Sequence, residues 1–213
     1  MTFQKNKYIV IKKAISLPLT KFVSQYFLLK RKVARKLFDE RYISQFTTEF
    51  GVWNDAQMPN TYSHYADIAM ETLLTWVQPV MEKHTGYKLT PTYSYARIYK
   101  KGDVLERHTD RFSCEISTTM NLGGDPWALY LEPSGKKGMK GIKVDLKPGD
   151  MLVYSGCELE HWREVFQGKD CVQVFLHYNK ADSKRARENE FDNRPHLGLP
   201  EWFQNIKLPP PKK

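Results

Sequence analysis

The sequence predicts a mainly β protein with flanking helices, an α+β arrangement around a sandwich or double-sheet jelly roll. Two observations predict this class. From Thr92 onward, short runs rich in β-branched and aromatic residues alternate with turn signals such as Gly123-Gly124 and Pro148-Gly149-Asp150. Before Thr92, two longer segments repeat apolar residues at helical spacing. Seven or eight short strands at this spacing are typical of a jelly roll, and we expect the two helices to pack on the outer face of one sheet.

The bulk composition fits one globular domain. The chain has 213 residues, of which 41% are hydrophobic and 13% aromatic, well above what a disordered chain carries. A chain of this length buries roughly 70% of its unfolded surface and needs no disulfide to fold. We expect a single domain over 1–213, with helical support at 14–86, a jelly-roll core at 92–180 and a C-terminal extension at 181–213.

The cysteine content and the net charge limit which cellular compartment and which binding partners we expect. Cys114, Cys157 and Cys171 are an odd set without CxxC spacing, which predicts reduced thiols in a cytoplasmic protein. No apolar run approaches the roughly 18 residues of a membrane span, and the N-terminus does not read as a secretory signal. The net charge of +9 permits an anionic partner, but the basic runs at 30–36 and 184–187 are more often solvated helix faces.

The first half of the chain reads as a strand and two helices. Residues 7–13 form a short strand, Ser16 caps a helix over 17–37, and Pro18 occupies its first turn. A second helix is expected over 65–83, with a kink at Pro79 and a stop at Gly86. The stripes expected to face the core are Leu19, Phe22, Val23, Tyr26, Phe27, Val33 and Leu37 in the first helix, and Leu73, Trp76, Val77, Val80 and Met81 in the second.

The second half reads as strands followed by a polar tail. The tail includes an apolar stretch at 195–203 that should dock on the body, and its last residues, PPPKK, are expected to fray. The expected strands are 93–99, 104–109, 114–121, 127–132, 142–146, 151–155 and 171–178.

The strongest chemical signal is the tetrapeptide RHTD at 107–110. Residues two apart in a strand point to the same side, so His108 and Asp110 can offer an imidazole nitrogen and a carboxylate oxygen to one ion. Two histidines and one carboxylate on one face of an octahedron leave open positions, which suits iron(II) oxygenases. His161 is our choice for the third ligand, since it follows a strand and a short turn that bring it back beside His108. The weaker alternatives are His64, His84, His177 and His196.

An HxD tripeptide alone is weak evidence, because a surface His and Asp could produce it by chance. Its context strengthens it: the pair ends a strand in an all-β region, and a later His follows a PGD turn and another strand. Residues 93–179 resemble the catalytic core of the prolyl-4-hydroxylase-like 2-oxoglutarate/iron(II) dioxygenases. The resemblance is carried by YKKGDVLERHTD (99–110), ISTTMNL (116–122), LKPGDMLVYSG (146–156), and His161 followed by CVQVFLHY (171–178).

The resemblance implies a double-stranded β-helix (cupin-like) core and a hydroxylase. It implies iron(II) held by His108, Asp110 and His161, with 2-oxoglutarate and O2 as co-substrates and ascorbate as an accessory reductant. Oxidation of a small-molecule or peptide substrate would be coupled to conversion of 2-oxoglutarate to succinate and CO2. Tyr99 matches a family tyrosine that contacts the co-substrate, Thr118 holds a position where relatives place a second donor, and Gln173 could add an amide contact.

The sequence departs from the family pattern at the residue that anchors 2-oxoglutarate. Relatives place a basic residue on the strand after the distal histidine, but 171–178 carries no Lys or Arg. Three candidates remain, ranked Arg163, then Lys169, then Arg97, because Arg forms a two-pronged pair with a carboxylate and Lys a point contact. A solvated surface charge is the alternative for each.

Two competing functions stay open at this point. An oxygenase of the same chemistry acting on a nucleobase fits the net charge, but the paired arginines of the nucleic-acid demethylases are not found after the distal histidine. A non-enzymatic, metal-binding cupin-like module would fit a missing 2-oxoglutarate anchor. The prime substrate is not readable, because fold does not fix function.

Overall fold

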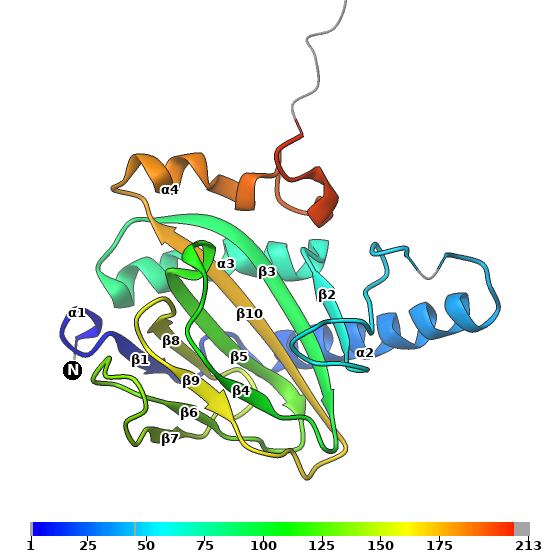
Figure 1. Ribbon diagram of the computed structural model, residues 1–213, viewed down its shortest axis with the longest axis horizontal. Coiled ribbons are helices and arrows are strands. Elements are labelled where there is room, and N and C mark those ends of the chain that lie inside the picture. Colours follow the sequence, from blue (N-terminus) through cyan, green and yellow to red (C-terminus); the bar gives the residue numbers. More distant parts are fainter. Residues whose placement is uncertain (1, 45, 207–213) are drawn as a thin grey trace, which may run out of the picture.

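Two antiparallel sheets form the body of the molecule (Figure 1). The computed structural model describes residues 2–44 and 46–206. The large sheet has the strand order β1-β8-β5-β10-β3-β2, and the small sheet has the order β4-β9-β6-β7. The strands are β1 (Tyr8–Ile11), β2 (Tyr62–Tyr65), β3 (Leu89–Lys100), β4 (Leu105–His108), β5 (Ile116–Gly124), β6 (Leu129–Leu131), β7 (Ile142–Val144), β8 (Met151–Ser155), β9 (His161–Arg163) and β10 (Asp170–Lys180).

Helices cover one face of the large sheet, as expected from the sequence (Figure 1). The helices are α1 (Phe3–Asn6), α2 (Leu17–Asp39), α3 (Ile68–Thr85) and α4 (Lys184–Glu188), with 3-10 turns η1 (Phe112–Cys114), η2 (Glu190–Asn193) and η3 (Glu201–Phe203). Alternate residues of β3, β5 and β10, such as Ile98, Met120 and Val174, form one core with α2 and α3. The opposite faces of these strands therefore look toward the small sheet, where the site lies.

The caps of both long helices follow from their sequences. Ser16 accepts a hydrogen bond from the backbone N–H of Leu19, with Pro18 in the first turn, as predicted. Gly86 ends α3 in a left-handed conformation (φ 75°) and donates its N–H to the carbonyl of Glu82, also as predicted.

Several boundaries differ from the predictions. The second helix begins at Ile68, not Tyr65, because residues 62–65 form β2 and Asp67 caps the helix. The expected strand 114–121 starts at Ile116, since 112–114 is a 3-10 turn. Strand β9, which carries His161, was not predicted; three residues are too few for a period-2 signal.

Three side chains expected in the core are exposed: Phe22 at 70%, Val33 at 41% and Trp76 at 69%. Each helix rests on one sheet face only, so an apolar side chain outside that stripe meets solvent. The C-terminal stretch 195–203 docks on the body, where Leu197 packs on the core and Gly198 donates its N–H to Glu71. The expected fraying at 209–213 concerns residues outside the described ranges.

Within the described ranges, none of the helices combines the length and apolar character needed to cross a bilayer. Cys114, Cys157 and Cys171 are all free thiols, as expected.

Candidate metal centre

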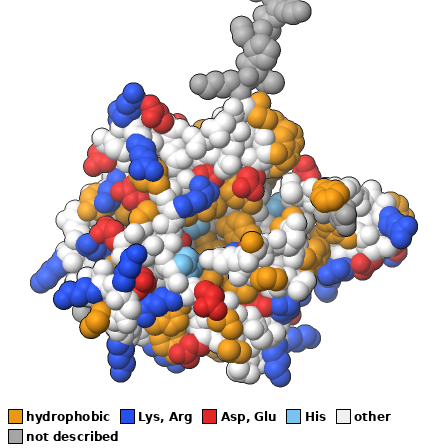
Figure 2. Space-filling model, viewed as in Figure 1, with side chains coloured by type: hydrophobic (Ala, Val, Ile, Leu, Met, Phe, Trp, Pro, Cys, Tyr) orange, Lys and Arg blue, Asp and Glu red, His pale blue; other side chains and the backbone are white. Residues whose placement is uncertain are grey.

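A cavity of about 480 Å³ opens between the two sheets. Figure 2 shows the hollow on this face, with histidine and hydrophobic side chains at its walls. Its lining comes from the inward faces of the central strands of the large sheet, from β4, β6 and β9, and from the loop before β2. The side chains that matter below are Asp55, Gln57, Tyr65, Tyr93, Arg97, His108, Asp110, Arg111, Cys114, Thr119, Tyr154, His161 and His177.

His108, Asp110 and His161 converge at this cavity. Strands β4 and β9 pair so that His108 lies opposite His161. One carboxylate oxygen, Asp110 Oδ1, lies 3.7 Å from His108 Nε2 and 3.5 Å from His161 Nε2. The three ligand atoms lie within 4.8 Å of one another, which allows one ion to contact all three.

Each imidazole is oriented by a backbone carbonyl. His108 Nδ1 lies 2.7 Å from the carbonyl oxygen of Glu106, and His161 Nδ1 lies 3.1 Å from that of Leu159. A carbonyl can only accept, so Nδ1 carries the proton in both rings and Nε2 keeps its lone pair for a metal. Burial, followed by the electrostatic effect of the neighbouring His161, lowers the pKa of His108 and favours its neutral, metal-binding form.

Asp110 is held as an ionised carboxylate. Burial alone would raise its pKa, but the neighbouring His161 and a hydrogen bond from Ser117 hold the pKa well below the ordinary carboxyl range. Ser117 Oγ lies 2.8 Å from Asp110 Oδ2, so it fixes the oxygen that does not face the histidines. Gly156 leaves the space for this arrangement, because a Cβ there would lie 2.4 Å from Asp110 Oδ2 and 2.3 Å from the carbonyl oxygen of Cys114.

Arg163 lies on β9, the strand that carries His161, and is 1% exposed. It follows His161 by two residues on β9 and so points to the same side. Its Nη1 donates to the carbonyl of Trp127 at 2.5 Å, and its Nη2 makes long contacts of 3.4 Å to Thr119 Oγ1 and Gln173 Oε1. Among the described residues, no carboxylate pairs with this guanidinium, and its Nε has no partner. Burial lowers the pKa of Arg163.

The other two basic candidates are placed differently. Arg97 lines the cavity, but its guanidinium pairs with Asp55 at 2.5 Å and donates to Gln57 Oε1 at 2.7 Å. The amide nitrogen of Gln57 lies 3.3 Å from His108 Nε2. Lys169 is exposed and lines a surface groove beside α2, outside this cavity.

The predicted hydroxyl and amide groups fall on both sides of the large sheet. Tyr99 and Gln173 point inward, next to Arg97 and Arg163 respectively. Thr118 corrects our expectation: it shares the parity of Ile116 and Met120, which pack under the helices, and its hydroxyl has no partner. Thr119 lines the cavity instead. The sequence located the strand but did not show which of its two faces lines the cavity.

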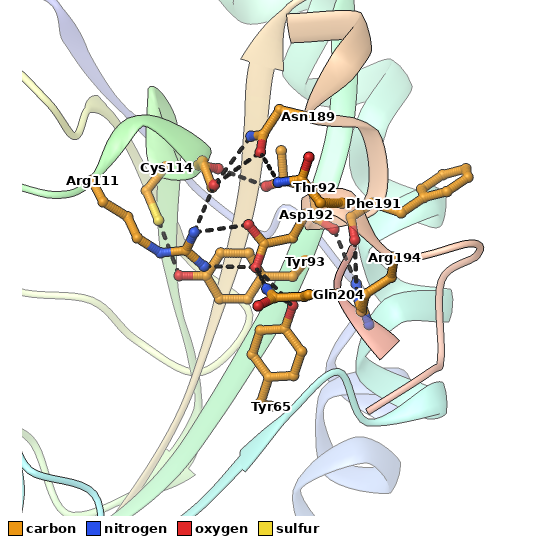
Figure 3. Close-up of polar contacts among 12 residues, drawn as sticks. Tyr65, Thr92, Tyr93, Arg111, Cys114, Asn189, Phe191, Asp192, Arg194 and Gln204 are labelled. Carbon is orange, nitrogen blue, oxygen red and sulfur yellow. Dashed lines mark hydrogen bonds and ion pairs between the residues drawn. The ribbon is translucent and has the colours of Figure 1, made fainter. Parts of the chain in front are cut away.

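The mouth of the cavity was not foreseen from the sequence. Arg111, next to the ligand Asp110, pairs with both oxygens of the buried Asp192 at 2.8 and 2.7 Å (Figure 3). Tyr65 and Gln204 also donate to Asp192. The segment after α4, for which the sequence offered only an apolar docking signal, thus builds one wall of the mouth.

His177, a weaker alternative for the third ligand that could also have been a core histidine, faces the cavity. Burial lowers its pKa to about 4, so its imidazole is neutral. Asp110, Cys114 and His177 form a second group whose ligand atoms lie within 4.8 Å of one another, and it shares Asp110 with the first group.

Comparison with known proteins shows the fold. No protein-family model matches the chain, and no curated protein is similar to it in sequence. A prolyl-4-hydroxylase from Pseudomonas putida superposes with a TM-score of 0.59 at 13% identity, over 84% of this chain and 95% of that one. HygX from Streptomyces hygroscopicus, solved with nickel and 2-oxoglutarate, gives 0.59 at 12% identity over 84% and 85%. A prolyl hydroxylase from Trichoplax adhaerens, in complex with a hypoxia inducible factor peptide fragment, gives 0.58 at 15% identity over 84% and 86%.

These matches confirm the predicted fold class. The chain has the double-stranded β-helix fold of the prolyl-4-hydroxylases and other 2-oxoglutarate/iron(II) oxygenases. At 12–15% identity the likeness extends to the fold alone, so the chemistry of this chain has to be argued from its own residues.

Proposed function

We propose that this protein is a 2-oxoglutarate- and iron(II)-dependent dioxygenase that hydroxylates a peptidyl or free amino acid, or another small substrate. The observation that carries the proposal is a cavity lined by the His-Asp-His triad and by Thr119, whose hydroxyl lies 3.4 Å from the buried, carboxylate-free Arg163. The triad fits a divalent metal, since two Nε2 lone pairs and one ionised oxygen face one point. The arginine fits an anion with a carboxylate at one end.

Arg163 supports the co-substrate half of the proposal on energetic grounds. A buried charge without a partner costs several kcal/mol, so such groups are normally paired. Here the guanidinium has a free Nε and two long contacts, which a carboxylate could replace with short, charge-assisted bonds. We propose Arg163 as the anchor of the distal carboxylate, flanked by Thr119 and Gln173, and leave Lys169 out because of its exposed position.

The roles of the side chains follow from these contacts. His108, Asp110 and His161 would hold Fe(II), which together with 2-oxoglutarate and O2 supplies the oxidising power when bound. The carbonyls of Glu106 and Leu159 fix the two imidazoles, and Ser117 fixes the carboxylate. Trp127 and Phe166 pack together beside Tyr99, so they keep water from the buried guanidinium and strengthen its attraction for an anion.

The decisive experiment measures succinate formed from 2-oxoglutarate with Fe(II) and ascorbate, first without and then with a panel of amino acids, peptides and nucleic acids. We expect succinate from the wild type, stimulated by amino acids or peptides. His108→Ala, Asp110→Ala and His161→Ala should reduce succinate to background, whereas His84→Ala and His196→Ala should not. Full activity of His161→Ala would show that the third ligand is a different residue.

The nucleobase alternative is an outcome of the same panel, and stimulation by nucleic acid alone would replace the proposed substrate class. A protein that binds metal but releases no succinate under any condition would be the non-enzymatic cupin-like module. We also propose a reducing compartment, the cytoplasm, on the basis of the three free thiols.

A further inference from the structure

His177 lies in the cavity next to the triad without belonging to it. It comes from the inward face of β10 and is 6% exposed. Its ring packs on Tyr93, with the ring centroids 4.6 Å apart. Its Nδ1 lies 2.9 Å from Ser117 Oγ, the same hydroxyl that contacts Asp110. A continuous path of hydrogen bonds therefore joins His177 to a metal ligand.

Which group donates and which accepts along this path follows from the chemistry of each group. Ser117 Oγ has three neighbours: Asp110 Oδ2 at 2.8 Å, the Cys114 carbonyl oxygen at 2.9 Å and His177 Nδ1. The ionised carboxylate and the carbonyl can only accept, so the single hydroxyl proton goes toward them. The remaining lone pair of Ser117 Oγ must then accept from His177, which places a proton on Nδ1.

A neutral imidazole with its proton on Nδ1 has a bare lone pair on Nε2. His177 lines the cavity, and none of the hydrogen bonds formed by the described residues reaches its Nε2. The chamber beside the metal ligands thus contains a hydrogen-bond acceptor on a buried side chain. Nε2 is not among the buried side-chain atoms that lack a partner, so it is open to the cavity. A ligand that covers Nε2 without bringing a donor would leave it unpaired at a cost of about 1–3 kcal/mol, so the site favours a ligand with a donor.

We propose that His177 positions the metal ligand Asp110 through Ser117 and uses its bare Nε2 to accept a hydrogen bond from the prime substrate. The inference rests on the proposed function and narrows its substrate: the part of the substrate that contacts His177 carries a hydroxyl, an amide N–H or an ammonium. Amino acids and peptides have such a donor, and a pure hydrocarbon does not.

The tautomer can be read directly from two-bond 1H–15N correlations of the 15N-labelled protein loaded with Zn(II), a diamagnetic stand-in. We expect the His177 signals, assigned by their loss in His177→Phe, to show a protonated Nδ1 and an unprotonated Nε2 at pH 7. In Ser117→Ala this preference should weaken, because the acceptor for Nδ1–H is gone. A protonated Nε2 in the wild type, in either the neutral or the charged ring, would overturn the acceptor role.

The positioning role is tested by calorimetric titration with Ni(II), which needs no turnover. Ser117→Ala should weaken Ni(II) binding about 10- to 100-fold, as loss of such supporting contacts does at metal sites. His177→Phe, which keeps the ring on Tyr93, should weaken it on the order of tenfold. His177→Asn should recover most of the loss, because its amide nitrogen can donate to Ser117 from near the place of Nδ1.

Two controls separate the possible results. His64→Phe makes the same change at a buried imidazole on β2 (7% exposed) outside the cavity, and it should leave Ni(II) binding unchanged. In the Ser117→Ala background, His177→Phe should add nothing, since both act along one path. If the two losses multiply, or if His177→Phe binds Ni(II) like the wild type, the positioning role fails. If His108→Ala also binds like the wild type, the proposed metal centre itself fails.

Discussion

At the scale of single residues, the most informative feature is a charge without a counter-charge. Arg163 takes the inward position on β9 of the small sheet, and the small, buried Cys171 lies on β10 of the large sheet, next to Asp170, near which the family pattern led us to expect a basic residue. The two side chains lie close enough for each to shift the pKa of the other. A guanidinium that comes from β9 of the facing sheet can therefore fill the place of a basic residue on β10.

If the cation has moved from β10 to β9, an arginine placed on β10 should compensate for the loss of Arg163. Arg163→Met should raise the half-saturating 2-oxoglutarate concentration on the order of a hundredfold, because removing one partner of a buried charge pair costs about 2–5 kcal/mol. Adding Cys171→Arg to Arg163→Met should restore part of the affinity by supplying the cation from β10. The measurement is succinate formation against 2-oxoglutarate concentration.

Lys169→Met is the matched control for that series. Lys169 is exposed beside α2, so its half-saturating 2-oxoglutarate concentration should equal that of the wild type. A strong rise in Lys169→Met together with a normal value in Arg163→Met would reverse the assignment of the anchor.

Substitution of two adjacent threonines tests which face of β5 lines the cavity. Thr119→Val removes a hydroxyl that contacts both Arg163 and Gln173, so it should weaken 2-oxoglutarate binding. Thr118→Val removes a buried hydroxyl that has no partner, so it should leave 2-oxoglutarate binding unchanged and stabilise the fold by about 1 kcal/mol. Urea unfolding together with the succinate assay measures both effects, and the opposite pattern would contradict the side assignment.

The sequence predicted the three ligand positions because strand periodicity puts His108 and Asp110 on one side and the jelly roll returns His161 beside them. The sequence analysis placed the hydroxyl donor at Thr118 and not at Thr119, because both faces of β5 are buried, so the sequence does not show which face lines the site. The contact between Ser117 and His177 was not predicted, because it depends on the pairing of two strands whose contacting residues are 60 positions apart.

At the scale of elements, the long helices were predicted from the sequence, whereas two of the short strands, β2 and β9, were missed. Caps and apolar spacing marked α2 and α3, because each has several turns over which a pattern can repeat. Strands β2 and β9 have four and three residues, too few to repeat anything. Their positions come from pairing with β3 and with β4 and β6, which no local pattern encodes.

Asp67 joins α3 to α2 and makes a testable contribution to stability. Its Oδ1 caps α3 by accepting from the N–H groups of Ala69 and Met70, and its Oδ2 accepts from Tyr26 and Lys30 of α2. Asp67→Asn keeps a capping oxygen but loses the charge, so we expect a loss of about 1–3 kcal/mol at pH 7. Asp39→Asn, at an exposed pair with Arg35, should cost almost nothing.

The pH dependence of this loss has a definite sign. Burial would raise the pKa of Asp67, but His64 and Lys30 hold it well below the ordinary value. A carboxyl whose folded pKa is depressed stabilises the protein above its unfolded pKa of about 4 and loses that contribution as the pH falls. The difference between wild type and Asp67→Asn in urea unfolding should therefore shrink from pH 7 to pH 3. A gap that grows on acidification would contradict this account.

At the scale of the whole molecule, the segment after α4 ties three distant parts of the chain together. Asp192 pairs with Arg111 beside the metal ligands, and Arg194 pairs with Glu71 of α3. Phe191, Asp192 and Asn193 all have a left-handed backbone (φ 53°, 57° and 61°), which costs roughly 1–2 kcal/mol per non-glycine residue. The ion pairs of Asp192 and Arg194, visible in part in Figure 3, offset this strain. The sequence showed only an apolar stretch here, because the partners come from elements 80 to 120 positions earlier.

The pair of Arg194 and Glu71 provides the last test. Both side chains are almost fully buried (0% and 2% exposed), and Arg194 Nη2 lies 2.7 Å from Glu71 Oε1. Arg194→Met leaves the carboxylate buried and unpaired, which should destabilise the protein by about 3–5 kcal/mol. Adding Glu71→Gln should recover a large part, because it removes the stranded charge while keeping an acceptor for Gly198. Urea unfolding of both variants measures this, and equal stability of the single and double variants would show that the pair does not hold the C-terminal segment in place.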